Sequence, residues 1–214
     1  SGERIDVSFA EPTDTLTLVV RKKDPASPAA FTLSGLDLRG KDRGITYHAI
    51  GVNGAKAKSY LQCGHLPGQL RKLDPDWVIL SLGTNEAYNP EFSTNSFREN
   101  LTRLIQTVRE NTDGAWILMN TPGDALHGGK YDNPHNQRAR ETIIEVAGEQ
   151  HCSWWDFYEI MGGTHSIIDW NLHQLTARDK LHLNKQGYQL KADLFIEALL
   201  KAFGNFRSKQ EPTK

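Results

Sequence analysis

The sequence predicts an α/β fold, in which helices cover both faces of a parallel sheet. Two continuous apolar runs, at residues 77–82 and 115–119, have the pattern of parallel strands that are buried on both faces. Amphipathic helical patterns alternate with these runs after residue 50, and such alternation is typical of parallel sheets. With 214 residues, the chain is long enough for one such domain, or for one domain and a small module.

The composition is that of a globular protein and argues against two classes of partner. Hydrophobic residues make up 38% of the chain and charged residues 24%, the ordinary balance of a folded domain. The formal net charge is -1 and the Lys and Arg residues are scattered, which argues against a nucleic-acid-binding protein. No apolar run approaches the roughly 18 residues of a membrane-spanning helix. Cys63 and Cys152 lie far apart, which favours free thiols over a disulfide or a metal site.

Residues 1–46 show a different pattern, that of short antiparallel strands. Apolar and polar residues alternate at 5–9 and again at 16–20, with a turn predicted at 11–14. A further strand is predicted at 45–50. So short a set cannot close a sandwich by itself and leaves strand edges unpaired. Because the chain also begins without an initiator Met, we expect it to be the later part of a longer protein.

The other elements are predicted in order along the chain. Short helices are expected at 55–61 and 67–73, and a longer one begins at Ser96, where Glu99 completes a capping-box spacing. The later elements are a helix at 136–148, a third strand at 153–158, an irregular loop at 162–177, a final helix capped by Asn184, and a polar tail at 207–214.

Glycine and polar residues stand where the predicted strands end. The segments are 51–54, 83–86, 120–122 and 159–163. The carboxyl ends of parallel strands meet at one edge of the sheet, and ligands bind there in open α/β folds. We therefore expect these motifs to converge on one rim, with 51–54 included if the preceding strand joins the sheet.

Four residues of the chain have the chemistry that acyl transfer needs. Asp179 and His182, three residues apart, can act as a catalytic base and the carboxylate that orients it. The side-chain amide of Asn85 and the backbone N–H of Gly54 can donate hydrogen bonds to a developing oxyanion. Each residue alone is more often structural, so the prediction depends on the combination. The serines considered as nucleophiles lack the required sequence setting: Ser8, Ser34, Ser81, Ser153 and Ser166.

The combination resembles the SGNH hydrolases, also called GDSL-like esterases and lipases, whose blocks carry Ser, Gly, Asn and His in chain order. Residues 51–55 are similar to the second block, with Gly54 as its glycine. Residues 83–86 match the third block, with Asn85 as its asparagine. Glu86 stands where Asp is more usual, a mild departure that leaves the role of the asparagine intact.

Asp179 and His182 match the fifth block, so the resemblance covers about residues 47–203. It implies a three-layer, flavodoxin-like parallel sheet, with residues 47–206 forming the C-terminal portion of the hydrolase domain. The first block, Gly-Asp-Ser, is absent. The resemblance is to bacterial carbohydrate or peptidoglycan O-acetylesterases with a β-sandwich, carbohydrate-binding-like module inserted after that block. Residues 1–46 would be remnant strands of the module, and the nucleophilic Ser is expected on an upstream segment.

The resemblance implies a serine esterase that removes O-acetyl groups from a carbohydrate or glycan, with no metal or other cofactor. His182 would be the base, held by Asp179. Trp170 and Glu86 are expected to contact the substrate, Trp170 because an aromatic side chain at the rim can stack on a sugar ring. Such proteins are expected in the periplasm or outside the cell. Two alternatives stay open: a non-catalytic carbohydrate-binding or pseudo-enzyme module, and an O-acyltransferase that uses the same residues.

Overall fold

The computed structural model describes residues 5–11, 13–28, 30–33, 35–38, 40 and 44–210. The chain divides into two compact units, residues 1–50 and residues 51–214. Parts of three predictions lie outside the described residues: Pro12 in the turn at 11–14, the candidate serine Ser34, and the tail residues 211–214.

The first unit does not form the strands that its sequence predicted. Its described residues between 5 and 50 contain neither helix nor strand. The apolar side chains of the alternating pattern are exposed, from 44% at Leu16 to 98% at Ile45. A strand needs a neighbouring strand for its backbone hydrogen bonds, and its apolar face needs a covering layer. Neither is found among the described residues of this unit, so the strand prediction for 5–50 is corrected. Its assignment to an inserted module stays a prediction.

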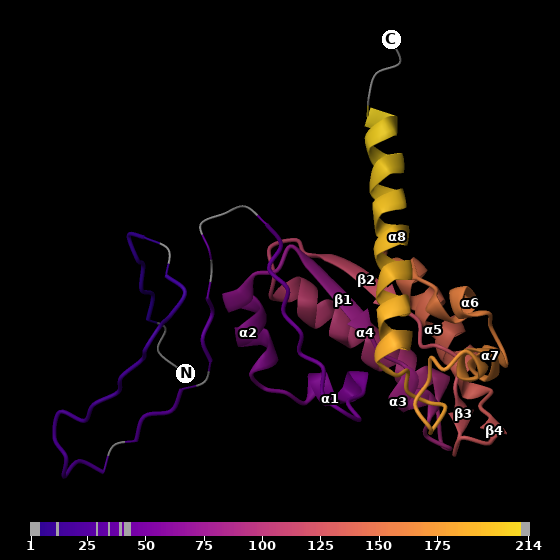
Figure 1. Ribbon diagram of the computed structural model, residues 1–214, viewed down its shortest axis with the longest axis horizontal. Coiled ribbons are helices and arrows are strands. Elements are labelled where there is room, and N and C mark those ends of the chain that lie inside the picture. Colours follow the sequence, from indigo (N-terminus) through magenta and orange to yellow (C-terminus); the bar gives the residue numbers. More distant parts are fainter. Residues whose placement is uncertain are drawn as a thin grey trace. The chain divides into compact units, whose positions relative to one another are not determined.

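The second unit is built on a parallel sheet, as predicted (Figure 1). Its strands are β1 (Trp77–Ser81), β2 (Trp116–Asn120) and β5 (Ser153–Trp155), in the order β1-β2-β5. Trp77 pairs with Trp116, and Leu118 pairs with Ser153. A small antiparallel pair, β3 (Leu126–His127) with β4 (Tyr131–Asp132), lies in the loop after β2.

One layer of helices covers the face of the sheet that carries Val78, Ile117 and Met119. Four of the helices whose apolar residues build this core are α1 (Ala57–Leu61), α2 (Leu66–Leu73), α4 (Thr94–Glu110) and α5 (His135–Glu149). The sequence predicted all four. The start of α4 differs: Ser93 is its cap, because the Ser93 side chain accepts a hydrogen bond from Ser96 N at 3.3 Å. Ser96 therefore lies inside the helix.

A second layer covers the opposite face, which completes the predicted three-layer arrangement. It contains α6 (Phe157–Met161), α7 (Ser166–Leu172) and α8 (Lys185–Gln210). Phe195 of α8 stacks on Trp77 of β1 at 6.3 Å and meets Trp155 of β5 edge-on at 5.0 Å. Two predictions are corrected here: the third strand ends at Trp155, since α6 follows it, and the loop at 162–177 contains α7.

The beginning of α8 is fixed as the sequence predicted. Asn184 Oδ1 accepts a hydrogen bond from Gly187 N at 3.0 Å, which caps the helix. Gly187 is required for packing, because a Cβ atom there would collide with the carbonyl oxygen of Leu175. The helix continues to Gln210, beyond the point where a polar tail was predicted, because its pattern of apolar residues persists to Phe206.

Candidate active site

Asp179 and His182 form a hydrogen-bonded pair in the loop between α7 and α8. Asp179 Oδ2 lies 2.7 Å from His182 Nδ1. Asp179 Oδ1 accepts backbone hydrogen bonds from Leu181 N and His182 N, both at 3.0 Å. One carboxylate thus stabilises the turn from 179 to 182 and also holds the imidazole of His182. The side chains are 50% and 58% exposed, so the pair stands at the surface.

The loop that carries this pair is held on both sides by backbone hydrogen bonds. Ala177 N donates to His182 O at 2.8 Å, and Leu126 N of β3 donates to Lys180 O at 3.0 Å. Lys180 adopts a left-handed backbone conformation, with φ of 48°. Such a conformation is costly for a residue with a side chain, and the surrounding hydrogen bonds hold it. The imidazole is therefore presented by a defined turn.

The hydrogen bonds around Asp179 favour its charged form. Partial burial alone would raise the pKa of the Asp179 carboxyl. The backbone N–H and ring of His182 and the backbone N–H of Leu181 outweigh it and lower the pKa from 3.8 to about 2. Asp179 is consequently a carboxylate at any pH at which the protein would work, as an orienting partner for a base must be.

Asn85 lies directly after β1, at the start of the short helix α3 (Thr84–Ala87). Gly83 makes the turn with φ of 112°, a conformation that favours glycine. Asn85 Nδ2 donates to Ala55 O at 2.8 Å, which ties the turn to the loop that contains Gly54. The amide nitrogen carries two hydrogens, so one remains for a ligand.

Glu86 connects the same two segments from inside the protein. Its carboxylate accepts hydrogen bonds from Gly83 N at 3.1 Å and from Ala57 N at 2.7 Å. The residue is only 9% exposed. Glu86 was predicted to contact the substrate, but both of its oxygens bind backbone N–H groups. It is a positioning residue, which fixes the start of α1 relative to the end of β1.

Gly54 occupies a tight turn beside these residues. Its φ is 75°, and Ala55 N closes the turn by donating to Val52 O at 3.1 Å. No hydrogen-bond acceptor for Gly54 N occurs among the described residues. The backbone N–H is therefore exposed and able to donate to a ligand.

A small hollow joins two of these segments. It has a volume of about 70 Å³. His182 borders it on one side, and Thr84, the neighbour of Asn85, borders it on another. The other lining residues are Gly123, Asp124, Phe157, Met161, Leu181, Leu183, Tyr188 and Lys191. The hollow therefore lies between the Asp179–His182 loop and the segment that follows β1. Of the four predicted catalytic residues, His182 lines it, and Gly54, Asn85 and Asp179 do not. None of its lining residues is a serine.

Trp170 does not contact this hollow. Its side chain is 9% exposed, its indole N–H donates to Met161 O at 3.0 Å, and its ring packs edge-on against Phe157. The prediction that Trp170 stacks on a substrate sugar is corrected, because α7 turns this residue into the core. A helix at 166–172, once recognised, places Trp170 on the same face as the buried Ile167.

The sequence analysis missed Tyr188 and Lys191, which line the hollow from the first turns of α8. Burial lowers the pKa of the Lys191 ammonium to about 8. Its Nζ lies 4.3 Å from the centre of the Phe157 ring. A detectable signal was the spacing: Tyr188, Lys191 and Phe195 recur at intervals of three and four residues, which places a lysine on the apolar face of the helix.

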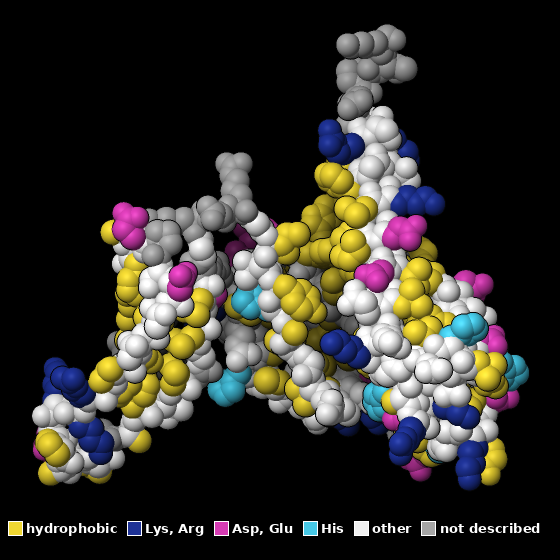
Figure 2. Space-filling view, viewed as in Figure 1, with side chains coloured by type: hydrophobic (Ala, Val, Ile, Leu, Met, Phe, Trp, Pro, Cys, Tyr) yellow, Lys and Arg dark blue, Asp and Glu magenta, His cyan; other side chains and the backbone are white. Residues whose placement is uncertain are grey.

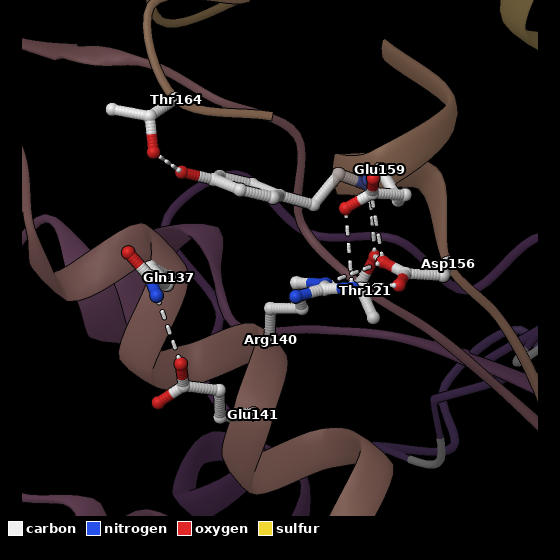
Figure 3. A network of polar contacts seen from close by, with 8 residues as sticks. Thr121, Gln137, Arg140, Glu141, Asp156, Glu159 and Thr164 are labelled. Atoms are coloured by element: carbon white, nitrogen blue, oxygen red, sulfur yellow. Dashed lines mark hydrogen bonds and ion pairs between the residues drawn. The ribbon is translucent and has the colours of Figure 1, made fainter. Parts of the chain in front are cut away.

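A second polar network supports the sheet near this rim (Figure 3). Arg140 Nε of α5 donates to both oxygens of Asp156, at 3.0 and 2.8 Å. Thr121, which follows β2, donates to the same carboxylate at 3.1 Å. Glu159 lies 3.3 Å from the guanidinium of Arg140. These contacts fix α5 and α6 to the ends of β2 and β5.

Three observations concern other kinds of site and hold for the described part of the chain. Its His, Cys, Asp and Glu side chains nowhere gather in groups of three that could hold a metal ion. None of its helices is both long enough and apolar enough to cross a membrane. Cys63 is exposed, Cys152 is buried, and both are free thiols, as favoured from their spacing.

Several solved structures share this fold. A peptidoglycan O-acetylesterase superposes with a TM-score of 0.68 and 23% identity, over 72% of this chain and 45% of that chain. A lipase/acylhydrolase from Enterococcus faecalis has a TM-score of 0.54 and 22% identity, over 68% of this chain and 71% of that chain. An acetyl xylan esterase has a TM-score of 0.55 and 19% identity, over 69% of this chain and 78% of that chain. The chain thus spans less than half of the first of these proteins. No curated protein matches the sequence.

The family match rests on most of the sequence. Residues 23–190 match the GDSL-like Lipase/Acylhydrolase family, a range that contains Gly54, Asn85, Asp179 and His182. The parallel sheet with flanking helices and the similar esterase structures agree with that match. The chain belongs to the GDSL-like lipase/acylhydrolase family.

Proposed function

We propose that this chain is the C-terminal portion of a serine esterase that hydrolyses O-acyl groups, acetyl above all, on a carbohydrate. The observation that carries the proposal is the 2.7 Å pair of Asp179 and His182, whose imidazole residue lines a hollow together with Thr84. A hydrogen-bonded base and orienter beside donors for an oxyanion is the arrangement that acyl transfer requires.

His182 is the general base in this mechanism. Asp179 holds Nδ1, so Nε2 is the ring nitrogen that takes the proton of a serine hydroxyl as the oxygen attacks the ester carbonyl. The proton then passes from Nε2 to the leaving sugar oxygen, and the C–O bond breaks. Water repeats the sequence on the acyl-enzyme and releases the acid and the serine.

Gly54 and Asn85 stabilise the charge that develops on the carbonyl oxygen. The N–H of Gly54 has no partner among the described residues, and Asn85 keeps one amide hydrogen after binding Ala55. Glu86 holds the two segments together through Ala57 and Gly83. Removing one such donor typically costs about 2.7–4 kcal/mol of barrier.

The nucleophilic serine is supplied by a segment outside these 214 residues. Strand β1 pairs only with β2 among the described residues, and its Trp77 and Ile79 are 37% and 38% exposed. A segment that adds to β1 as a parallel strand would cover these side chains and would end at the rim beside Gly83. Apolar side chains on α8, such as Leu200 and Phe203, are also exposed (Figure 2). Apolar surface of this extent commonly marks a contact with further protein.

The proposed substrate class rests on the named structures. A peptidoglycan O-acetylesterase and an acetyl xylan esterase share the fold, and their names specify acetyl esters of glycans. Such a substrate would place the protein in the periplasm or outside the cell. An acyltransferase would use the same residues with an alcohol in place of water, and product analysis with an alcohol acceptor separates the two reactions.

The test is hydrolysis of p-nitrophenyl acetate by a longer natural protein that carries this chain. His182→Ala is expected to lower kcat/KM by at least about 10³-fold, since the base of a catalytic triad contributes an effect of this order or larger. His65→Ala is the control, because His65 is exposed and its side chain makes no capping hydrogen bond. The 214-residue chain alone is expected to be inactive. Near-normal turnover by His182→Ala would refute the assignment.

A further inference from the structure

Lys191 is a positively charged residue in the hollow that the proposed mechanism does not use. It lies on α8, three residues after Tyr188, and shares the lining of the hollow with His182. The position is unusual for a lysine, because the neighbouring residues of the same helix face, Leu194 and Phe195, pack against the core. A cation next to a catalytic pair is a candidate for substrate binding.

The ammonium group has no anionic partner among the described residues. Among the described residues, no carboxylate lies within salt-bridge distance of Lys191, and its ammonium lies 4.3 Å from the centre of the Phe157 ring. An aromatic ring attracts a cation, but it accepts no conventional hydrogen bond, so the three N–H donors of the ammonium stay available to solvent or to a ligand. Burial is what lowers the pKa of Lys191, and no neighbouring carboxylate offsets that effect.

Asp124, the acid that lines the same hollow, is occupied elsewhere. Its Oδ2 accepts a hydrogen bond from Ile167 N, at the start of α7, at 3.1 Å. The residue is 7% exposed, and burial raises the pKa of its carboxyl. His165, another charged neighbour of Asp124, pairs with Asp132 at 2.9 Å. Asp124 and Asp132 therefore have other partners, and neither forms an ion pair with Lys191.

We propose that Lys191 binds a carboxylate group of the substrate, so that the site prefers acyl esters carried by acidic sugars over those of neutral sugars. This inference rests on the proposed function, because it names the substrate class of the same site. The volume of about 70 Å³ suits a carboxylate, since one water molecule occupies about 30 Å³ in the liquid. His182 lines the same hollow, so we expect an acidic sugar to bring its ester to the imidazole and its carboxylate to the ammonium.

The experiment compares two matched esters on a longer natural protein that carries the chain. One is an O-acetylated methyl glucoside, and the other is the acetylated methyl glucuronide, in which the CH₂OH group is oxidised to a carboxylate. The measured quantity is the ratio of kcat/KM for the acidic ester to that for the neutral ester. Lys191→Met, which keeps the length of the side chain, is expected to lower this ratio about tenfold, the size of effect that loss of one charged hydrogen bond gives.

Two further variants separate charge from packing. Lys191→Arg keeps the charge and is expected to retain a preference for the acidic ester. Lys201→Met removes an exposed lysine from the same helix and is expected to leave the ratio as in the unmodified protein. Circular dichroism of each variant checks that the fold is intact. A ratio that is the same in Lys191→Met and in the unmodified protein would overturn the proposal.

Binding without turnover distinguishes a failure of this inference from a failure of the proposed function. Calorimetry measures the affinity of the unacetylated methyl glucuronide and of methyl glucoside for the unmodified protein and for Lys191→Met. If neither ester is hydrolysed, the proposed function fails. Tighter binding of the glucuronide that Lys191→Met abolishes still supports the role of Lys191. Equal binding of the two sugars contradicts it.

Discussion

Two carboxylates near the rim of the sheet, Asp156 and Asp179, each hold a cationic or titratable side chain. Asp156 also accepts one backbone hydrogen bond, and Asp179 accepts two. Asp156 caps α6 through Glu159 N and binds Arg140. Asp179 closes its own turn through Leu181 N and binds His182. The local chemistry is similar, so the different roles must come from the partner and the surroundings.

The partner and the exposure separate the two pairs. Arg140 and Asp156 are 24% and 19% exposed, and Thr121 and Glu159 add to their network (Figure 3). Arginine keeps its proton under all ordinary conditions, so this pair can only hold elements together. His182 and Asp179 are 58% and 50% exposed. Histidine exchanges its proton near neutral pH, so an exposed carboxylate–imidazole pair suits proton transfer.

Loss of the Arg140–Asp156 pair is expected to lower the stability of the protein more than loss of the Asp179–His182 pair. Arg140→Met leaves the partly buried Asp156 carboxylate without its cation and should lower the free energy of unfolding by about 2–3 kcal/mol, somewhat below the cost for a fully buried pair. Urea unfolding measures the change. Arg98→Met is the matched control, since Arg98 pairs with Glu149 on the surface at 2.8 Å and should cost less than about 1 kcal/mol. Equal losses for both variants would remove the distinction drawn here.

Loss of the His182 ring is expected to have a smaller effect, which is a change in the pKa of Asp179. Carbon-13 NMR of the carboxyl should give a pKa of about 2, and His182→Ala should raise it toward 3.8, because the variant loses the ring hydrogen bond. A carboxyl with a lowered pKa contributes stability that is complete above the unfolded value and is lost as the pH falls through the folded value. The contribution of Asp179 should therefore disappear between about pH 4 and pH 2. A titration of Asp179 that His182→Ala leaves unchanged would show that the pair does not form in solution.

Much of the second unit could be predicted from the sequence because its signals are local and strong. The apolar runs of β1 and β2 have the pattern of buried strands, and the apolar stripe of α4 has the pattern of a helix with one buried face. The start of α4 was misplaced because Ser93 and Ser96 are both good caps, and the choice depends on the turn before them. In the first unit the sequence does alternate between apolar and polar residues, but a strand also needs a neighbouring strand for its backbone hydrogen bonds.

The residues of the candidate site that could be predicted are those that belong to short sequence motifs. Gly54, Asn85, Asp179 and His182 stand in short patterns with fixed spacing, and the structure places them in the turns described above. Their roles stay proposals.

The contributions of Trp170, Glu86 and Lys191 depend on contacts between distant segments. The direction of each side chain is set by its partners: Met161 for Trp170, Ala57 for Glu86 and Phe157 for Lys191. Spacing indicates the helix face on which Trp170 and Lys191 lie, but it does not reveal the partner that each side chain contacts.

The most direct test of the proposed site is the structure of a longer natural protein that carries this chain, after reaction with a phosphonate ester. The phosphonate should be bonded to a serine outside these 214 residues. The Oγ atom of that serine should lie beside Nε2 of His182, and a phosphonyl oxygen should lie about 3 Å from both Gly54 N and Asn85 Nδ2, the distance of oxyanion-hole donors. A phosphonate bonded away from the hollow, with Gly54 and Asn85 contacting nothing, would contradict the assignment.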